Sequence, residues 1–290
     1  MKFKKSQLYT MWSGAIIICV LVSMFALIFA SCSHGEKDTD DTPKQTLAVD
    51  IETPEPVNTP APAETAPADV TEPPEASVPP ESGTPTRLAE TADAGIEYQD
   101  KFVFLGDSTT YGLKYYGVLS GGENTTQVWT PESGTLTLSN QSIATIVYPE
   151  TGEQITIADA AGRKKPEYLL ITLGVNGVSF MDEDYFTSEY TALVKSIQQA
   201  SPDTKIILNS IYPVASNYEY LSSINNELIT RANGWIEKIA EDTGVRFLNT
   251  FEAIVGADGW LPQQYQTDGL HLNTDGFNII LNYLRTHEYR

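Results

Sequence analysis

An apolar segment that ends abruptly in small and polar residues constrains the fold of this chain most. Residues 102–105 are all apolar, and Gly106-Asp107-Ser108 follows directly. A short unbroken apolar run is typical of a parallel β-strand that is buried on both faces. In open α/β sheets, functional residues lie beyond the carboxyl ends of the strands. We therefore expect Ser108 to lie at a functional site.

Two later segments supply polar residues that suit the same site. In the first, the apolar run 168–173 leads to Asn176; in the second, Asp268 and His271 are three residues apart, just before the last amphipathic segment. A serine hydroxyl is almost never ionised at neutral pH, so it needs a base in order to act as a nucleophile. His271 is a suitable base, and the sequence thus predicts one site built from three distant segments.

These segments resemble the motif blocks of the GDSL (SGNH) hydrolase family. The similarity rests on Gly106-Asp107-Ser108, Gly174-Val175-Asn176 and Asp268-Gly269-Leu270-His271 together, in this order, and it covers residues 96–290. The family often has Gly-x-Asn-Asp in its middle block, whereas Gly177 follows the asparagine here. Because the asparagine is kept, this departure bears on the subfamily more than on the mechanism.

Acyl-transfer chemistry gives each of these residues a role. His271 takes the proton of Ser108 as the hydroxyl attacks an ester carbonyl, and Asp268 orients the imidazole. The side-chain amide of Asn176 and the backbone N–H of Ser108 are the expected donors to the oxyanion. The resemblance also implies a glycine N–H from a second block, and Gly134 is our candidate for it.

Strand and helix patterns alternate through residues 96–290, which predicts an α/β fold with a mainly parallel sheet. We expect a flavodoxin-like three-layer sandwich with five strands in the order 2-1-3-4-5 and helices on both faces. The first and third strands are neighbours in this order, so Ser108 and Asn176 should emerge side by side. The clearest strands are expected at 102–105, 168–173, 205–210 and 245–248, and the clearest helices at 185–200, 221–242 and 275–287.

The region 125–157 departs from this alternation and predicts a small antiparallel insertion near the site. Three β-like segments lie at 135–138, 143–148 and 155–157, with Gly134 before the first and Gly152 before the last. Two interpretations of its aromatic residues remain open. Trp129, Tyr148 or both form a wall that faces the substrate, or Trp129 packs on the sheet.

Residues 1–31 have the pattern of an export signal. Three lysines near the start precede an apolar run over 14–30, which is also at the short end of what spans a bilayer. Small residues before Cys32 resemble a lipobox, so we expect lipid modification of Cys32, with an uncleaved anchor helix as the alternative. Either way, the protein is expected outside the cytoplasm, tethered to a membrane.

Residues 32–95 are rich in Pro, Thr, Ala and Glu, and we expect a disordered linker because such a segment has too little apolar surface to offset chain entropy. A Pro-rich recognition ligand is the alternative. Acidic residues exceed basic ones by about 11 here and by about 12 in the following domain. This charge argues against nucleic acid as a partner and against docking on anionic lipid.

The sequence offers few residues for metal or cofactor chemistry. Cys19 and Cys32 both precede the domain, so the domain contains no disulfide. His34 lies in the linker and His287 near the end of the last helix, which leaves His271 as the one histidine for the site. The common zinc ligand sets cannot be assembled from these residues, and neither glycine-rich nucleotide motif is present. We expect neither metal nor cofactor.

The sequence thus predicts an extracytoplasmic serine esterase that removes small acyl groups, such as acetyl, from carbohydrate or cell-wall polymers. The esterase chemistry follows from the site, whereas the carbohydrate substrate follows only from the tether and the location. Three alternatives remain: an O-acyltransferase that passes the acyl group to a sugar hydroxyl, a lipid esterase, and a noncatalytic carbohydrate-binding module.

Overall fold

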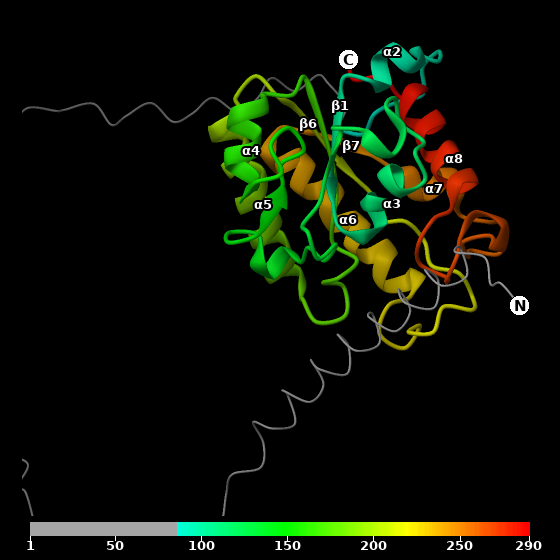
Figure 1. Cartoon of the computed structure of the whole chain (residues 1–290). Coiled ribbons are helices and arrows are strands. Elements are labelled where there is room, and N and C mark those ends of the chain that lie inside the picture. Colours follow the sequence, from blue (N-terminus) through cyan, green and yellow to red (C-terminus); the bar gives the residue numbers. More distant parts are fainter. Residues whose placement is uncertain (1–85) are drawn as a thin grey trace, which may run out of the picture. The chain divides into compact units, whose positions relative to one another are not determined.

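The computed structural model of the protein describes residues 86–290, and its centre is a five-stranded parallel sheet (Figure 1). The strand order is β2-β1-β5-β6-β7, so the predicted flavodoxin-like order is confirmed. The strands are β1 (Phe102–Gly106), β2 (Val128–Trp129), β5 (Tyr168–Thr172), β6 (Lys205–Asn209) and β7 (Arg246–Leu248).

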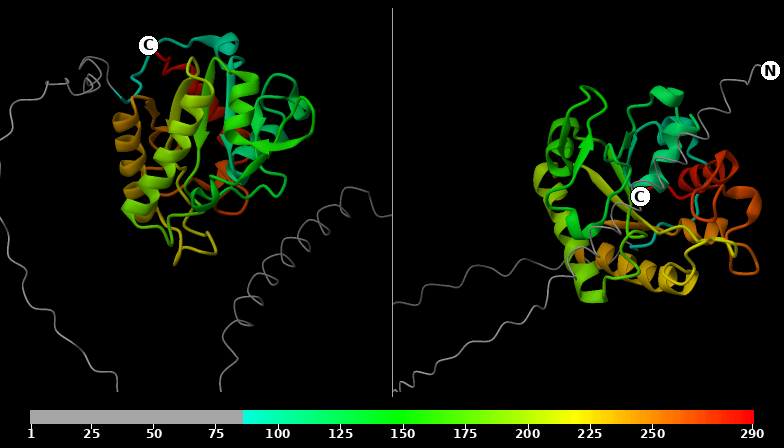
Figure 2. Two further views of the ribbon diagram at one scale, coloured as in Figure 1. Left: turned by 90° about the vertical axis from the view of Figure 1, so that its left-hand side faces the viewer. Right: turned by 60° about the horizontal axis from the view of Figure 1, so that its bottom comes forward.

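Helices cover both faces of this sheet and complete three layers (Figure 2). One face packs against α4 (Ile157–Lys164), α5 (Glu183–Ala200) and α6 (Asn226–Thr243). The other packs against α2 (Gly95–Gln99), α3 (Ser108–Tyr115), α7 (Thr250–Ile254) and α8 (Thr274–Arg285). Short 3-10 turns occur at η1 (Gly122–Asn124), η2 (Leu138–Asn140) and η3 (Gln263–Tyr265).

The apolar run of β1 is buried because its side chains alternate between the two layers. Val103 and Leu105 enter the core beneath α4, α5 and α6, whereas Phe102 and Phe104 enter the core beneath α2, α7 and α8. Each of the four is at most 4% exposed. This two-sided burial explains why the strand is apolar at every position rather than at every second one.

The register of the sheet brings the predicted site segments together. Gly106 at the end of β1 pairs with Thr172 at the end of β5, so the two strands end at the same level. The segments that follow them carry Ser108 and Asn176. Their proximity is therefore set by strand pairing in the middle of the sheet.

The predicted insertion is present but is smaller than expected. β3 (Thr145–Val147) and β4 (Gln154–Thr156) form an antiparallel hairpin, as predicted. The expected strand at 135–138 is wrong, because its end forms η2, in which turn hydrogen bonds replace strand pairing: Asn140 N–H donates to Thr137 O and Gln141 N–H to Leu138 O.

Trp129 belongs to the core rather than to a substrate-facing wall. It lies in β2, is fully buried and packs against Tyr148, with 6.3 Å between ring centroids. Tyr148 is itself only 7% exposed. The interpretation in which Trp129 packs on the sheet is therefore correct, and the wall interpretation is wrong for both residues.

The long helices form close to their predicted positions, with one corrected boundary. α6 begins at Asn226 rather than at residue 221, because the side chain of Asn225 accepts a hydrogen bond from Leu228 N–H and caps the helix there. Its end is capped by Gly244, which has φ +70°. Asn273 caps α8 by accepting from Gly276 N–H.

Residues 86–95, which composition assigned to the linker, pack on the domain. Phe247 N–H donates to Thr86 O, and Leu88 N–H donates to Phe247 O, so this segment lies along the edge of β7. The predicted signal or anchor at 1–31, Cys32 and the rest of the predicted linker fall outside the described residues. Between residues 86 and 290, no helix has the length and apolar character needed to cross a membrane.

Candidate active site

Ser108 lies where β1 turns directly into α3. Asp107 caps the helix by accepting from Thr109 N–H, and Ser108 is the first helical residue. Gly106 makes this tight turn sterically feasible. A Cβ at Gly106 would lie 2.0 Å from Thr110 Oγ1 and 2.6 Å from Thr172 O, and such contacts require a side chain or the backbone to move.

Asp268 and His271 lie on the loop before α8, and local hydrogen bonds fix their geometry. One Asp268 carboxylate oxygen accepts from the backbone N–H groups of Leu270 and His271, at 3.0 and 2.8 Å. The other lies 2.7 Å from His271 Nδ1. The loop turns at Gly269, which has φ +93°, a conformation that favours glycine. A Cβ at Gly269 would lie 2.7 Å from Tyr218 Cα.

His271 joins the two halves of the site. Its Nε2 lies 2.9 Å from Ser108 Oγ, so Asp268, His271 and Ser108 form a continuous chain of hydrogen-bonding groups. The three residues come from two segments that are more than 150 positions apart. The structure thus brings together the three residues that the sequence predicted as nucleophile, base and orienting carboxylate, while their catalytic roles remain a prediction.

The electrostatics of this chain keep Asp268 ionised and His271 basic. Burial alone would raise the pKa of Asp268, but hydrogen bonds from the side chain and backbone of His271 lower it to about 2. Burial alone would lower the pKa of His271, but the hydrogen bond to Asp268 and the negative charges of Asp268 and Asp107 together outweigh this effect and raise the pKa above its usual value.

Asn176 lies in the turn after β5, within hydrogen-bonding distance of Asp107. Its Nδ2 donates to Asp107 Oδ2 at 2.9 Å and to Leu136 O at 3.3 Å. Gly174 has φ +126°, and a Cβ there would lie 2.8 Å from Ile211 and 2.9 Å from Phe186, so this turn requires glycine. The sequence placed Asn176 near Ser108 but gave no sign that its amide would contact Asp107.

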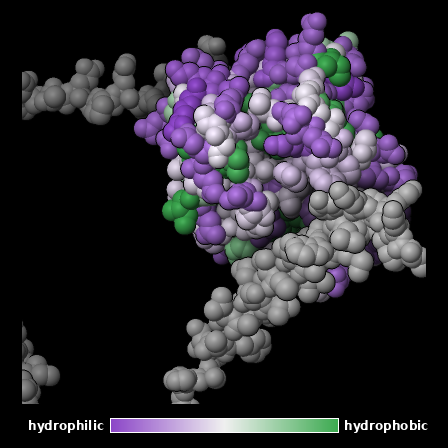
Figure 3. Space-filling model, in the orientation of Figure 1, coloured by the Kyte–Doolittle hydropathy of each residue, from purple (hydrophilic) through white to green (hydrophobic). Residues whose placement is uncertain are grey.

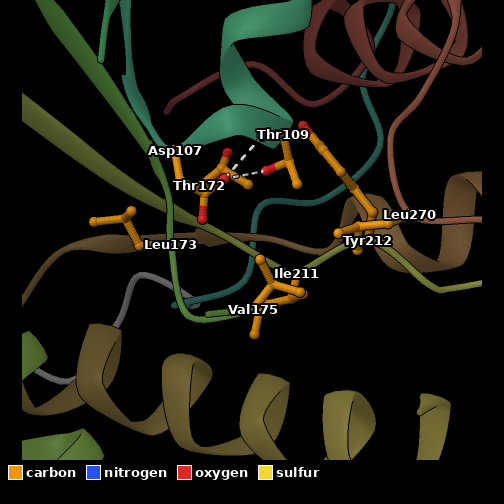
Figure 4. Close-up of a pocket in the computed structure, with 8 residues that line it drawn as sticks. All are labelled: Asp107, Thr109, Thr172, Leu173, Val175, Ile211, Tyr212 and Leu270. Carbon is orange, nitrogen blue, oxygen red and sulfur yellow. Dashed lines mark hydrogen bonds between the residues drawn. The ribbon is translucent and has the colours of Figure 1, made fainter. Parts of the chain in front are cut away.

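Asp107 is a buried carboxylate that the sequence analysis treated only as part of a motif. Its Oδ1 accepts from Thr109 N–H and Thr109 Oγ1, at 2.9 and 2.7 Å, and its Oδ2 accepts from Asn176. Figure 4 shows these Thr109 contacts beside a cavity of only about 10 Å³, about the size of one water molecule. Burial raises the pKa of Asp107 to about 6 despite these donors.

A larger open cavity of about 550 Å³ contains Ser108 in its lining. Side chains of α3 line one part of it, and residues of β2, of the segment after β2 and of the hairpin line the rest. The polar members of the lining include Lys114, Glu132 and Ser133, and the apolar members include Val128 and Val147. This size lies within the range of small-molecule sites, so a substrate can approach Ser108 from here.

Gly134 lines the same cavity as Ser108, with φ +74°. Its N–H, however, donates to Pro131 O at 2.9 Å in a turn. The structure therefore brings this predicted oxyanion donor to the cavity but engages its N–H elsewhere. Within residues 86–290, no three His, Cys, Asp or Glu side chains are grouped in a way that would hold a metal ion.

Comparison with known proteins links this arrangement to one family. The model of the GDSL-like lipase/acylhydrolase family matches residues 104–279. A Streptococcus pneumonia protein assigned as a platelet activating factor is 20% identical, with 67% of this chain and 91% of the other covered and a TM-score of 0.49. A GDSL-like lipase from Bacteroides thetaiotaomicron VPI-5482 is also 20% identical, with coverages of 63% and 85% and a TM-score of 0.44. The comparison with curated proteins found no match.

Proposed function

This chain belongs to the GDSL-like lipase/acylhydrolase family and is an SGNH-type hydrolase, and we propose that it hydrolyses small acyl esters, such as acetyl esters, with Ser108 as the nucleophile. One observation carries the proposal. His271 lies within hydrogen-bonding distance of both Ser108 and Asp268, at 2.9 and 2.7 Å. This is the arrangement that a serine needs in order to attack an ester.

The proposed reaction proceeds through an acyl-enzyme. Ser108 Oγ attacks the ester carbonyl while His271 Nε2 accepts the hydroxyl proton, and a tetrahedral oxyanion forms. Its collapse breaks the bond to the alcohol, which leaves with the proton from Nε2. Water then repeats the sequence: it gives a proton to Nε2, attacks the acyl carbon and releases the acid, while the proton returns to Ser108.

Asp268 acts on this reaction through His271. Its carboxylate accepts from Nδ1, so it selects the tautomer in which Nε2 is free to accept the Ser108 proton. Because the pKa of Asp268 is lowered to about 2, the carboxylate stays charged at neutral and mildly acidic pH. It therefore stabilises the imidazolium that forms as Ser108 attacks.

We assign oxyanion stabilisation to the Ser108 backbone N–H, in the first turn of α3, and to the Asn176 side chain. N–H groups in the first turn of a helix lack intrahelical acceptors and point toward incoming negative charge. Asn176 Nδ2 makes its longer contact with Leu136 O, at 3.3 Å, and this is the bond we expect it to exchange for the oxyanion. Gly134 remains a third candidate that would first have to release Pro131 O.

We further propose that the natural ester is on a carbohydrate or cell-wall polymer outside the cytoplasm. The support is the predicted tether: an export signal, a lipid-modified Cys32 and a long linker would hold the domain near the cell surface. Mass spectrometry of the N-terminal peptide tests the predicted tether. A lipid on Cys32 is expected, and retention of the N-terminal lysines would instead indicate an uncleaved anchor.

Hydrolysis of 4-nitrophenyl acetate by the purified protein tests the esterase proposal. Ser108→Ala should lower kcat by several orders of magnitude, as removal of a triad nucleophile does. Ser188→Ala is a matched control, because Ser188 lies exposed on α5. A folded Ser108→Ala variant with nearly normal turnover would refute the assignment. An EDTA-sensitive rate that zinc restores would favour a metal-dependent mechanism.

The alternative activities give different products from the same assay. An O-acyltransferase would consume the ester faster when a sugar alcohol is added, with the acyl group recovered on the sugar. A lipid esterase would turn over long-chain esters faster than acetyl esters. A noncatalytic module would leave all of these esters intact.

A further inference from the structure

Helix α3 carries two exposed tyrosines beside Ser108, and we propose that they bind the sugar chain that bears the ester. We call Tyr111 and Tyr115 the tyrosine face. This inference rests on the proposed esterase function, because it assigns the substrate class of the same site. Its occupant is a neutral oligosaccharide or polysaccharide whose sugar rings extend along the helix from the acylated unit.

The helix geometry places the tyrosine face next to the nucleophile. Tyr111 and Tyr115 follow Ser108 at positions i+3 and i+7, so all three lie along one side of α3. Their side chains are 45% and 62% exposed, and the ring centroids are 6.5 Å apart with planes 38° from parallel. The Tyr115 ring also contacts the Tyr116 ring nearly at right angles, with 4.9 Å between centroids, so the exposed tyrosines belong to one aromatic cluster along the helix.

Packing on the opposite side of α3 fixes this orientation. Leu113 is buried in the core, and a Cβ at Gly112 would lie 2.4 Å from the ring of Phe277 in α8. Rotation of the helix is therefore restricted by its buried side. The side with Tyr111 and Tyr115 must face outward whether or not a ligand is present.

The fold itself gives little reason for two exposed aromatic rings at these positions. Tyr116 packs against Phe277, at 6.2 Å between centroids, and so joins the core, whereas Tyr111 and Tyr115 belong to neither core cluster. Exposed aromatic side chains that lie together are typical of binding surfaces, since they offer a large, rigid contact area with few rotatable bonds.

Two open cavities that share lining residues lie between the tyrosine face and Ser108. A second open cavity, of about 480 Å³, is lined by Tyr111, Lys114, Tyr115, Tyr116 and Glu123. Tyr111 and Lys114 also line the 550 Å³ cavity that contains Ser108. A substrate with its acyl group at Ser108 can therefore extend past Tyr111 onto Tyr115.

The chemistry of the second cavity favours a sugar chain over a lipid chain. Its lining contains tyrosine, lysine and glutamate side chains and no aliphatic one. A sugar ring has an apolar C–H face that can lie on a tyrosine ring, while its hydroxyl groups can bond to Lys114, Glu123 and the phenol groups. An acyl chain would leave these polar groups without partners. On the face shown in Figure 3, hydrophobic residues likewise occur only in small separate patches.

Charge favours a neutral chain over an anionic one. Between residues 86 and 290, 26 Asp and Glu side chains stand against 13 Lys and Arg side chains. Glu132 and Glu123 line the two cavities, with Lys114 common to both. The net negative charge of the domain would repel a polyanion that approaches the site, whereas it would not repel a neutral sugar chain.

The ratio of kcat/KM for a substrate of four sugar units to kcat/KM for one unit measures the contribution of the tyrosine face. The probes are O-acetylated oligosaccharides of one and four sugar units, made from cellulose and from chitin, together with 4-nitrophenyl acetate. We expect a higher kcat/KM for four units than for one. Tyr115→Ala should reduce this ratio about 3- to 10-fold, mainly through KM, as expected for loss of one aromatic stacking contact. Tyr115→Phe keeps the ring and should retain most of the preference.

Tyr185→Ala is the matched control, because Tyr185 is an exposed tyrosine, 42% accessible, on α5, which packs on the opposite face of the sheet from α3. It should leave the ratio unchanged. An equal kcat/KM for one and four units, or a ratio that Tyr115→Ala does not alter, would overturn the sugar subsite. A preference for longer acyl chains that Tyr115→Ala removes would show a lipid-binding face instead. The proposed function fails separately, if Ser108→Ala still hydrolyses 4-nitrophenyl acetate.

Discussion

The two halves of the candidate site are held in place by different parts of the molecule. Ser108 follows a fully buried strand, next to Asp107, which is 0% exposed. His271 and Asp268 lie on a loop, with side chains that are 35% and 54% exposed. Paired strands and two core layers fix the first half, whereas hydrogen bonds within four residues fix most of the second.

Because of this difference, substitutions in the two halves should affect stability and activity differently. A substitution in the strand-end half disturbs core packing and buried hydrogen bonds, so it should cost stability. A substitution in the loop half removes groups that contribute little to the core, so it should cost activity with little loss of stability. The four predictions below test this division, beginning with the largest expected effect.

The two histidines of the domain should respond in opposite ways to the same change. His271→Ala removes the proposed base and should lower kcat by at least about 10⁴-fold, with a small change in Tm. His287, near the end of the last helix, is only 7% exposed. Its ring stacks on that of Tyr283, with 3.7 Å between ring centroids, and its Nδ1 donates to Tyr283 O. His287→Ala should therefore lower Tm and leave kcat nearly normal. The reverse result would contradict the proposed division.

Asn176→Ala should affect both properties, because Asn176 links the two roles. Loss of one oxyanion donor predicts a decrease in kcat of about 100- to 1,000-fold with little change in KM. Asp107 also loses a donor, which should cost about 1–3 kcal/mol of stability. Thr109→Ala removes a different donor to Asp107 and is the matched control for stability. If both variants lose stability and keep full turnover, Asn176 has only a structural role.

Gly106→Ala should lower stability by about 3 kcal/mol, at the upper end of the cost of overpacking, because its Cβ would lie 2.6 Å from Thr172 O. The same change at Gly234 is the control. A Cβ at Gly234 meets nothing within 4 Å in the interior of α6, so Gly234→Ala should stabilise the protein by about 0.5–1 kcal/mol. Urea unfolding measures both. A tolerated Gly106→Ala would mean that the strand-end half is less constrained than its packing indicates.

The two carboxylates should give stability opposite dependences on pH. The pKa of Asp107 is raised to about 6 in the folded protein, so the folded state binds more protons between about pH 4 and 6, and stability increases as pH falls. Between pH 7 and 5 this gain is about 1 kcal/mol. The pKa of Asp268 is lowered to about 2, so its contribution is present above about pH 4 and is lost as pH falls toward 2.

Thermal unfolding of His271→Ala with and without Asp107→Asn isolates the Asp107 effect. His271, whose pKa is raised, otherwise contributes in the same direction, with stability that is lost as pH rises through its folded pKa. We expect the gain between pH 7 and 5 to disappear in the double variant. An undiminished gain would show that Asp107 does not carry a raised pKa.

The sequence predicted those parts of the fold whose patterns are local. The apolar runs of β1 and β5 and the amphipathic helices identified the parallel sheet, and the strand order followed from the expected flavodoxin-like fold. It failed where tertiary packing overrides local pattern. Residues 135–138 alternate like a strand, yet they lie against the core and end in η2. Trp129 is as consistent with a binding wall as with a core residue until its burial is known.

The site was predictable to the extent that its residues lie in short motifs. Ser108, Asp268 and His271 follow from such segments, and the structure brings them together. The contact between Asn176 and Asp107 joins positions 69 residues apart, and it depends on side-chain orientation that no local pattern encodes. The engagement of the Gly134 N–H with Pro131 O is likewise invisible in the sequence. The spacing of Tyr111 and Tyr115 along α3 was a signal that sequence analysis passed over.

Covalent labelling with a fluorophosphonate, followed by mass spectrometry of the intact protein and its peptides, tests the central claim most directly. We expect one adduct on the wild-type protein, located on Ser108, with no adduct on Ser108→Ala and greatly slowed labelling of His271→Ala. An adduct that persists on Ser108→Ala, or a folded wild-type protein that takes up no label, would contradict the assignment of Ser108 as the activated nucleophile.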